Sequence, residues 1–210
     1  MKTFKQFFEE LGRGSGNGSL TIFDIDDTLF HTTAQIVVKD DSSGEVVKRL
    51  TGSEYNTHKL KSGQSYNYDE FRDAAKFYKE SRPISSMIDK AKAIVKNLIK
   101  NPDSKVIIVT ARANFDDKDK FLATFKKHGF PIDQTYVERA GNMNDILVPA
   151  VKKAIILRKY LNSGRFKKVS IFDDSESILK EFLRVSDKYP DIEFHAWLVD
   201  PKTGRVKKKK

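Results

Sequence analysis

Short apolar segments alternate with longer amphipathic segments along most of the chain. Continuous apolar runs of β-type composition predict strands at residues 20–25, 105–110, 135–138, 168–172 and 192–199. Apolar residues at helical spacing predict helices at about 84–100, 116–128, 149–162 and 175–188. Because apolar strands separated by helices are typical of a parallel sheet covered on both faces, we expect an α/β fold.

The segment 31–82 interrupts this alternation directly after the first strand. Residues 35–39 and 45–50 flank the polar turn Asp-Asp-Ser-Ser-Gly and predict a β-hairpin, and a helix is predicted near 68–80. We expect a small cap over the carboxyl edge of the sheet, where open α/β folds bind ligands. Its aromatic residues either stack on a base of the ligand or fill the core of the cap: Tyr55, His58, Tyr66, Tyr68 and Phe71.

The two ends of the chain differ in composition from the body, which we place at residues 20–200. Residues 1–19 predict a short amphipathic helix at 3–11 and then a flexible Gly/Ser linker. That helix either docks on another protein or packs on its own domain. Residues 201–210 form a basic tail, which either attracts nucleic acid or is a solvated, disordered terminus.

Composition and charge limit the class of protein. The 210 residues include 39% hydrophobic residues and 15 Phe, enough for a core, and no Cys, which excludes disulfides and thiolate metal sites. No apolar run approaches a membrane span, and acidic residues occupy the place of a signal-peptide core, so we expect a cytoplasmic protein with no membrane partner. The net charge of +10 is concentrated at one end, because six cations and no acid lie between Lys202 and Lys210.

The first predicted strand ends in closely spaced acidic residues. Asp24 and Asp26 lie two positions apart, so an extended backbone would direct both carboxylates to one side, and Thr28 follows. Two close carboxylates in a cleft repel each other unless they share a cation, and a hard divalent ion such as Mg²⁺ suits oxygen ligands. The alternative interpretation is a turn with a helix cap, since Asp and Thr favour both roles.

Polar residues also follow the second predicted strand. A Thr110 hydroxyl, the backbone N–H groups after it and the Arg112 guanidinium suit the oxygens of a phosphate group. The same residues also suit an ordinary helix N-cap.

Two further groups lie near the fourth predicted strand. Lys152, with Lys153 beside it, opens the preceding helix and could neutralise an anion, although most lysines on such a helix are merely solvated. Asp173 and Asp174 follow the strand directly and suit a metal, or else cap the next helix.

In this order the four groups resemble the signature motifs of the haloacid dehalogenase (HAD) superfamily over residues 20–199. The resemblance implies a Rossmann-like fold in which Asp24 is a nucleophile that becomes an aspartyl-phosphate and Asp26 is the general acid and base. It further implies that Thr110 and Lys152 bind phosphoryl oxygens. Asp24, the backbone carbonyl of Asp26 and an acid of the Asp173–Asp174 pair would hold Mg²⁺. The spacing of the motifs favours Lys152 over Lys153 and does not choose between Asp173 and Asp174.

Within the superfamily, residues 106–112 and 151–174 are similar to the 3′-phosphatase domain of phage-type polynucleotide kinase-phosphatases. This resemblance implies that Arg112, and with it Thr28 of the first motif, contacts the substrate. The chain differs from that family in Val148, in Asp27 and in lacking a kinase P-loop. We expect an Mg²⁺-dependent phosphomonoesterase for a nucleotide or a phosphorylated nucleic-acid end. Two alternatives remain: a phosphatase for another small ester, and a non-catalytic nucleic-acid-binding or assembly protein with a HAD fold.

Overall fold

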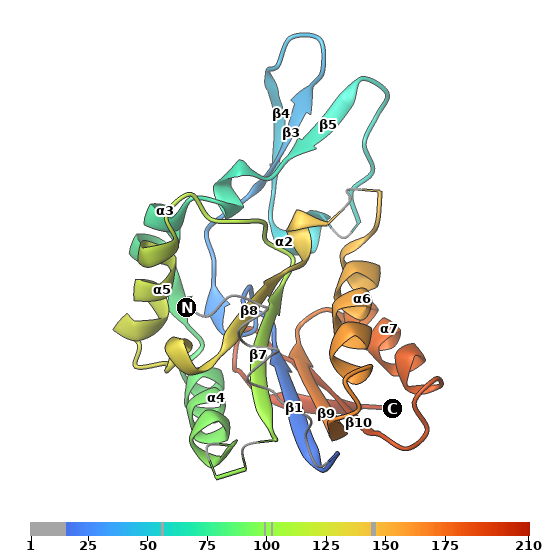
Figure 1. Ribbon diagram of the computed structural model, residues 1–210. Coiled ribbons are helices and arrows are strands. Elements are labelled where there is room, and N and C mark those ends of the chain that lie inside the picture. The colour runs from blue at the N-terminus through green and yellow to red at the C-terminus, as the bar shows by residue number, and fades with distance from the viewer. Residues whose placement is uncertain (1–15, 56, 99, 102, 144–145) are drawn as a thin grey trace.

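The computed structural model describes residues 16–55, 57–98, 100–101, 103–143 and 146–210 (Figure 1). A six-stranded sheet forms its centre, in the order β11-β10-β9-β1-β7-β8. All neighbours pair in parallel except β10 and β11, which are antiparallel. The strands are β1 (Gly18–Phe23), β7 (Lys105–Thr110), β8 (Tyr136–Arg139), β9 (Phe166–Asp173), β10 (Glu193–Val199) and β11 (Val206–Lys209). The predicted α/β fold class is therefore confirmed.

Helices cover the two faces of this sheet with separate apolar clusters. On one face lie α3 (Ala74–Glu80), α4 (Ser85–Leu98) and α5 (Lys118–Lys127), packed on a core rich in phenylalanine. On the other face lie α6 (Pro149–Leu161) and α7 (Glu176–Ser186). Alternate residues of each strand supply the two clusters, since Leu20 and Ile22 of β1 belong to one and Phe23 to the other. Among the described residues, no helix is long and apolar enough to cross a membrane.

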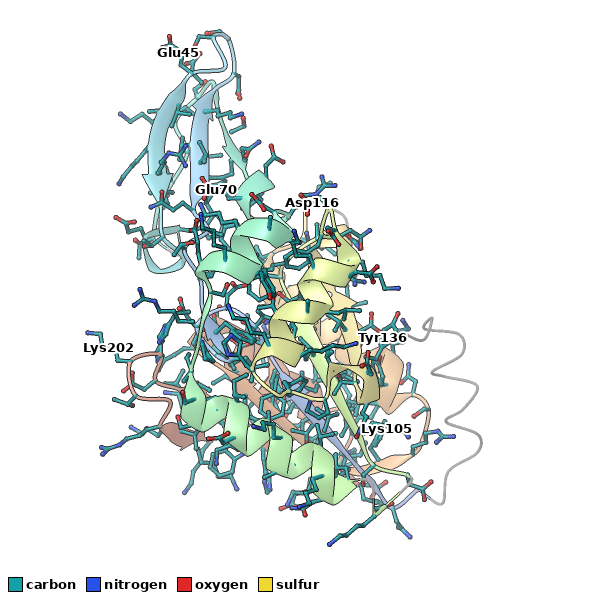
Figure 2. All side chains as sticks on the ribbon, turned by 90° about the vertical axis from the view of Figure 1, so that its left-hand side faces the viewer. Glu45, Glu70, Lys105, Asp116, Tyr136 and Lys202 are labelled. Atoms are coloured by element: carbon teal, nitrogen blue, oxygen red, sulfur yellow. The ribbon has the colours of Figure 1, made fainter. Side chains whose placement is uncertain are left out.

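The insertion after β1 forms a small sheet that projects beyond the carboxyl ends of the central strands (Figure 1). It contains β3 (Ile36–Asp40), β4 (Val46–Leu50) and β5 (Gln64–Asn67) in the order β4-β3-β5, all antiparallel, with the short α2 (Gly52–Tyr55). Figure 2 shows Glu45 at the far tip of this cap and Glu70 near its base. The hairpin was predicted, whereas β5 was not.

The base of the cap returns to the body through short elements. A 3₁₀ turn, η1 (Asp69–Phe71), precedes α3, which begins only at Ala74 because the Asp73 side chain accepts a hydrogen bond from the Lys76 N–H and caps it. The two-residue strands β2 (Phe30–His31) and β6 (Arg82–Pro83) then pair and close the insertion.

The interpretation of residues 201–210 as a disordered tail is wrong for β11. Val206 pairs with Val199 and Lys209 with Ala196, so these residues extend the central sheet by one strand. The ring of Trp197 stacks on Phe172, which stacks on Phe23, and Lys208 covers the Trp197 ring. The basic end is thus an ordered sheet edge. The helix predicted at 3–11 lies outside the described residues.

Candidate functional site

Asp24 directly follows β1, so it lies at the carboxyl end of an inner strand of the central sheet. Its backbone N–H donates to the Phe172 carbonyl of β9, which continues the β1–β9 pairing by one residue. Immediately afterwards the chain turns, because the Ile25 carbonyl accepts hydrogen bonds from three successive N–H groups, those of residues 28–30. Asp27 supports this turn with a φ of 55°, in the left-handed region that Asp tolerates better than most residues.

Lys153 of α6 joins the acidic residues of two strands. Its Nζ donates to Asp24 Oδ1 at 2.7 Å and to Asp173 Oδ2 at 2.8 Å, and all three side chains are buried. Burial lowers the pKa of Lys153, but the carboxylates of Asp173 and Asp24 outweigh this effect and raise the pKa overall. The lysine is therefore held as a cation between the strands.

One lysine does not neutralise this site. Burial, together with the charges of Asp173, Asp26 and Asp174, raises the pKa of Asp24 well above its usual value even though Lys153 lowers it. Burial and the Asp173 charge also raise the pKa of Asp174 to about 7. Three carboxylates against one ammonium leave two negative charges uncompensated when all are ionised.

The geometry of these acids fits a divalent cation. Asp24, Asp173 and Asp174 each offer a carboxylate oxygen, and these oxygens lie within 4.8 Å of one another. An all-carboxylate donor set with two excess charges is what a hard ion such as Mg²⁺ prefers. The Asp26 carboxylate, also named as a metal residue from the sequence, lies outside this group, so only its backbone carbonyl remains as the ligand that the resemblance implies.

The preference for Lys152 over Lys153 is corrected by the structure. Lys152 is also buried, and its Nζ donates to the Met143 carbonyl at 3.2 Å. Periodicity could not separate the two lysines, because Ile156 follows Lys152 by one helical turn and Leu157 follows Lys153 by one, and both positions are buried.

Arg112 contacts Asp26 and not an open phosphate site. Its Nε donates to both carboxylate oxygens of Asp26, at 3.2 and 2.9 Å, and its Nη2 donates to Oδ1 at 2.6 Å. The arginine side chain is 1% exposed. Its expected role as a substrate ligand stays a prediction, and the carboxylates of Asp24 and Asp26 contact different cationic partners, Lys153 and Arg112.

The two threonines of the motifs are both buried. Thr28 is 0% exposed and its Oγ1 has no hydrogen-bond partner among the described residues, and its contact with a substrate stays a prediction. Thr110 ends β7, and its hydroxyl accepts a hydrogen bond from the Arg112 N–H at 3.2 Å. Contact between Thr110 and a phosphoryl oxygen stays a prediction.

Most aromatic residues of the cap fill its own core. Tyr55, Tyr66 and Phe71 pack on a small apolar cluster of β3 and β4. His58 and Tyr66 form a hydrogen bond of 2.9 Å, as do the hydroxyls of Tyr55 and Tyr68. Of the two interpretations of these aromatics, the structure favours packing over base stacking.

Comparisons with known proteins add little to this picture. No protein-family model matches the chain, and no curated protein matches it. Among solved structures, the HAD domain of the effector protein Lem4 from Legionella pneumophila is similar over 87% of this chain and 88% of that chain, with 14% sequence identity and a TM-score of 0.42. A likeness at this distance carries no argument about this chain, so the HAD resemblance stays a prediction from the motif residues. The narrower likeness to polynucleotide 3′-phosphatases stays a prediction.

Proposed function

We propose that the protein is an Mg²⁺-dependent phosphomonoesterase that works through an aspartyl-phosphate on Asp24. The observation that carries this proposal is the cluster of Asp24, Asp173 and Asp174 with Lys153, in which two negative charges are uncompensated when all three acids are ionised. Such a cluster has no structural benefit by itself, because burying uncompensated carboxylates destabilises a fold. A divalent cation held by these three acids would supply the missing charge and reduce the repulsion between a carboxylate and a phosphate dianion.

In this mechanism the Asp24 carboxylate attacks phosphorus and the bond from phosphorus to the ester oxygen breaks. Asp26 gives a proton to the departing oxygen, so that an alcohol leaves and the phosphoryl group stays on Asp24. Asp26, now ionised, takes a proton from a water molecule that attacks phosphorus, which releases phosphate and restores Asp24. Lys153 keeps Asp24 oriented and stabilises negative charge on the transferred group.

The substrate that we propose is a nucleotide or a phosphorylated nucleic-acid end. Support comes from the exposed cations of the β10–β11 turn and of β11: Lys202, Arg205, Lys207 and Lys208. In the sheet register Lys207 pairs with Leu198, and Leu198 pairs with Asp173, so this basic edge begins two strands from the acids and at their level. At roughly 4.8 Å per strand the separation is about 10 Å, within reach of the neighbouring phosphates of a bound strand.

The direct test of the activity is phosphate release by the whole protein. We expect Mg²⁺-dependent hydrolysis of an aryl phosphate, loss of at least about 10³-fold in kcat for Asp24→Asn, and retention of its folded structure by circular dichroism. A variant with full turnover would refute the aspartyl-phosphate mechanism. If the native protein hydrolyses no phosphate ester but binds DNA or RNA, the non-catalytic alternative holds.

The substrate class needs a separate test that keeps β11 in the sheet. We propose replacing Lys202, Arg205, Lys207 and Lys208 with Gln, matched by a control in which the exposed Lys96, Lys100, Lys167 and Lys188 are replaced instead. The control removes the same charge near the amino ends of the strands, away from the acids at their carboxyl ends. For 3′- and 5′-phosphorylated oligonucleotides we expect a higher KM and a weaker salt dependence in the first variant alone. Equal effects on an oligonucleotide and on a sugar phosphate would favour the small-ester alternative.

A further inference from the structure

The Arg112 side chain joins three parts of the protein that are far apart in sequence. Besides Asp26, its Nη2 donates to Thr32 Oγ1 at 2.8 Å and its Nη1 donates to the Phe71 carbonyl at 2.9 Å. Phe71 ends η1 at the base of the cap and packs on the cap core. One guanidinium on the loop after β7 therefore contacts both the segment after β1, which carries Asp26 and Thr32, and the cap base.

Packing fixes this arginine in place. The guanidinium lies 4.9 Å from the ring centre of Phe71, 4.8 Å from that of Phe77 and 5.3 Å from that of Phe115. Its hydrogen bonds use four of the five N–H donors: Nε, both hydrogens of Nη2 and one of Nη1. A buried arginine with its donors already committed is a poor ligand for an incoming phosphate.

We propose that Arg112 is a positioning residue that orients Asp26 for proton transfer and makes that orientation depend on the seating of the cap base. This inference rests on the proposed phosphatase function. The bidentate contact from Nε and Nη2 fixes both carboxylate oxygens of Asp26, whereas an unpaired aspartate would sample several rotamers. Because Phe71 and Thr32 hold the same guanidinium, a displacement of the cap base would move Asp26 as well.

The loop that carries Arg112 is joined to the cap base at further points. Arg72 Nε donates to the Asn114 carbonyl at 3.3 Å, and the Asp116 N–H donates to the Arg72 carbonyl at 3.0 Å. In addition, the Ala74 N–H donates to the Asp116 carboxylate at 2.9 Å. These bonds make the cap base and residues 112–116 one connected unit.

The test compares Arg112→Gln and Arg112→Lys in the native and the Asp26→Asn backgrounds. For an aryl phosphate we expect Arg112→Gln to lower kcat by about 10²-fold, the usual size of a general acid/base contribution, with the inhibition constant of inorganic phosphate unchanged. Arg112→Lys keeps the charge and much of the packing but cannot make the fork-like contact, so it should not restore kcat. In the Asp26→Asn background the same substitutions should cost less than about threefold.

A matched control addresses simple destabilisation. Arg165 is as buried as Arg112, at 3% exposed, but it directly precedes β9 and so lies at the amino end of that strand, away from the acids. Arg165→Gln should lower the unfolding temperature while keeping kcat near that of the native protein. If Arg112→Gln fails to fold, the lysine variant and Thr32→Val, which removes one partner of the guanidinium, carry the test through kcat.

Three results would overturn the inference. The first is a rise in the inhibition constant of inorganic phosphate with kcat preserved. The second is a kcat of the Arg112→Lys variant equal to that of the native protein. The third is a loss of kcat in each double variant that equals the product of the losses in the two single variants. Its failure is distinguishable from failure of the proposed function, because in the latter case the native protein itself releases no phosphate. In that case the coupling between Arg112 and Asp26 is still measurable in the free energy of unfolding of the single and double variants.

Discussion

The ammonium of Lys153 lies 2.7 Å from a carboxylate oxygen of Asp24, so a residue of helix α6 is bonded directly to the end of the central strand β1. This contact identifies which of two adjacent lysines belongs to the site. It also explains how a buried carboxylate stays oriented at a strand end.

Replacing Lys153 with Met removes the cation from a buried cluster of carboxylates. We expect kcat for an aryl phosphate to fall by about 10²–10³-fold, because one charge that stabilises the transferred phosphoryl group is lost. Lys152→Met is the matched control, since that side chain is equally buried and donates to the Met143 carbonyl instead. Steady-state kinetics of both variants check this expectation, and a larger loss in the Lys152 variant would contradict it.

Magnesium affinity should depend on pH because of Asp174. Its pKa of about 7 in the folded protein lies above the unfolded value of about 3.9, so the folded state holds the proton more tightly. Without metal, the contribution of Asp174 to the free energy of unfolding is therefore largest below about pH 4 and declines as the pH rises to about 7. Since bound Mg²⁺ displaces the proton, its affinity should rise about tenfold per pH unit up to about pH 7 and then level off.

Calorimetric titration of Mg²⁺ across this pH range measures the effect. Asp174→Asn serves as the control, because an amide cannot titrate and should remove the part of the slope that this group contributes. An affinity that stays constant between about pH 5.5 and 7 in the native protein would contradict the raised pKa.

Gly141 lets one loop pass very close to another at the site. A Cβ on this residue would lie 2.5 Å from the Ala111 carbonyl oxygen and 2.6 Å from the Arg112 carbonyl carbon, both backbone atoms that cannot rotate away. We therefore expect Gly141→Ala to displace the loop carrying Arg112 and to lower kcat by about tenfold or more. Gly18→Ala, which would meet the Asp103 backbone at 2.2 Å, should destabilise the fold with less effect on kcat per degree of lost unfolding temperature. An equal loss of kcat per degree of lost unfolding temperature in the two variants would refute the expected effect of Gly141 on the site.

Removing residues 205–210 should destabilise the protein, although one interpretation of the sequence is a solvated, disordered terminus. The deletion would strip β11 from β10, leave an open hydrogen-bonding edge and uncover Trp197. We expect a lower unfolding temperature and concentration-dependent aggregation, measured by calorimetry and light scattering. The variant that replaces four of the exposed cations with Gln keeps the strand and should remain monodisperse, which separates the role of the charge from that of the backbone.

The strands and helices of the body could be predicted because their apolar patterns are local. The strand expected at 105–110 and the helix expected at 149–162 agree with β7 and α6 to within one residue. β5 and β11 could not be found in this way, because their sequences, Gln-Ser-Tyr-Asn and Val-Lys-Lys-Lys, carry few apolar residues. Backbone pairing with a neighbouring strand, and not burial of side chains, makes them strands.

The site was predictable in its residue types and less so in its contacts. Asp24, Asp173 and Asp174 come together because parallel strands end at one edge, a consequence of topology that the alternating pattern already implies. The partner of Arg112 could not be predicted, because its pairing with Asp26 spans 86 positions and depends on where the cap base lies. The choice between Lys152 and Lys153 likewise depended on the rotation of α6 relative to the sheet.

Trp197 is the single tryptophan of the chain, and its position makes it a built-in optical reporter. Its ring stacks on Phe172, whose chain neighbour is Asp173, and the ammonium of Lys208 lies 5.9 Å from it on the sheet edge. The indole emission therefore comes from one place, between the acidic cluster and the basic strand. Binding of a cation at the acidic cluster, or of a polyanion at the basic strand, can be followed in the unlabelled protein by the emission maximum and intensity of its tryptophan fluorescence.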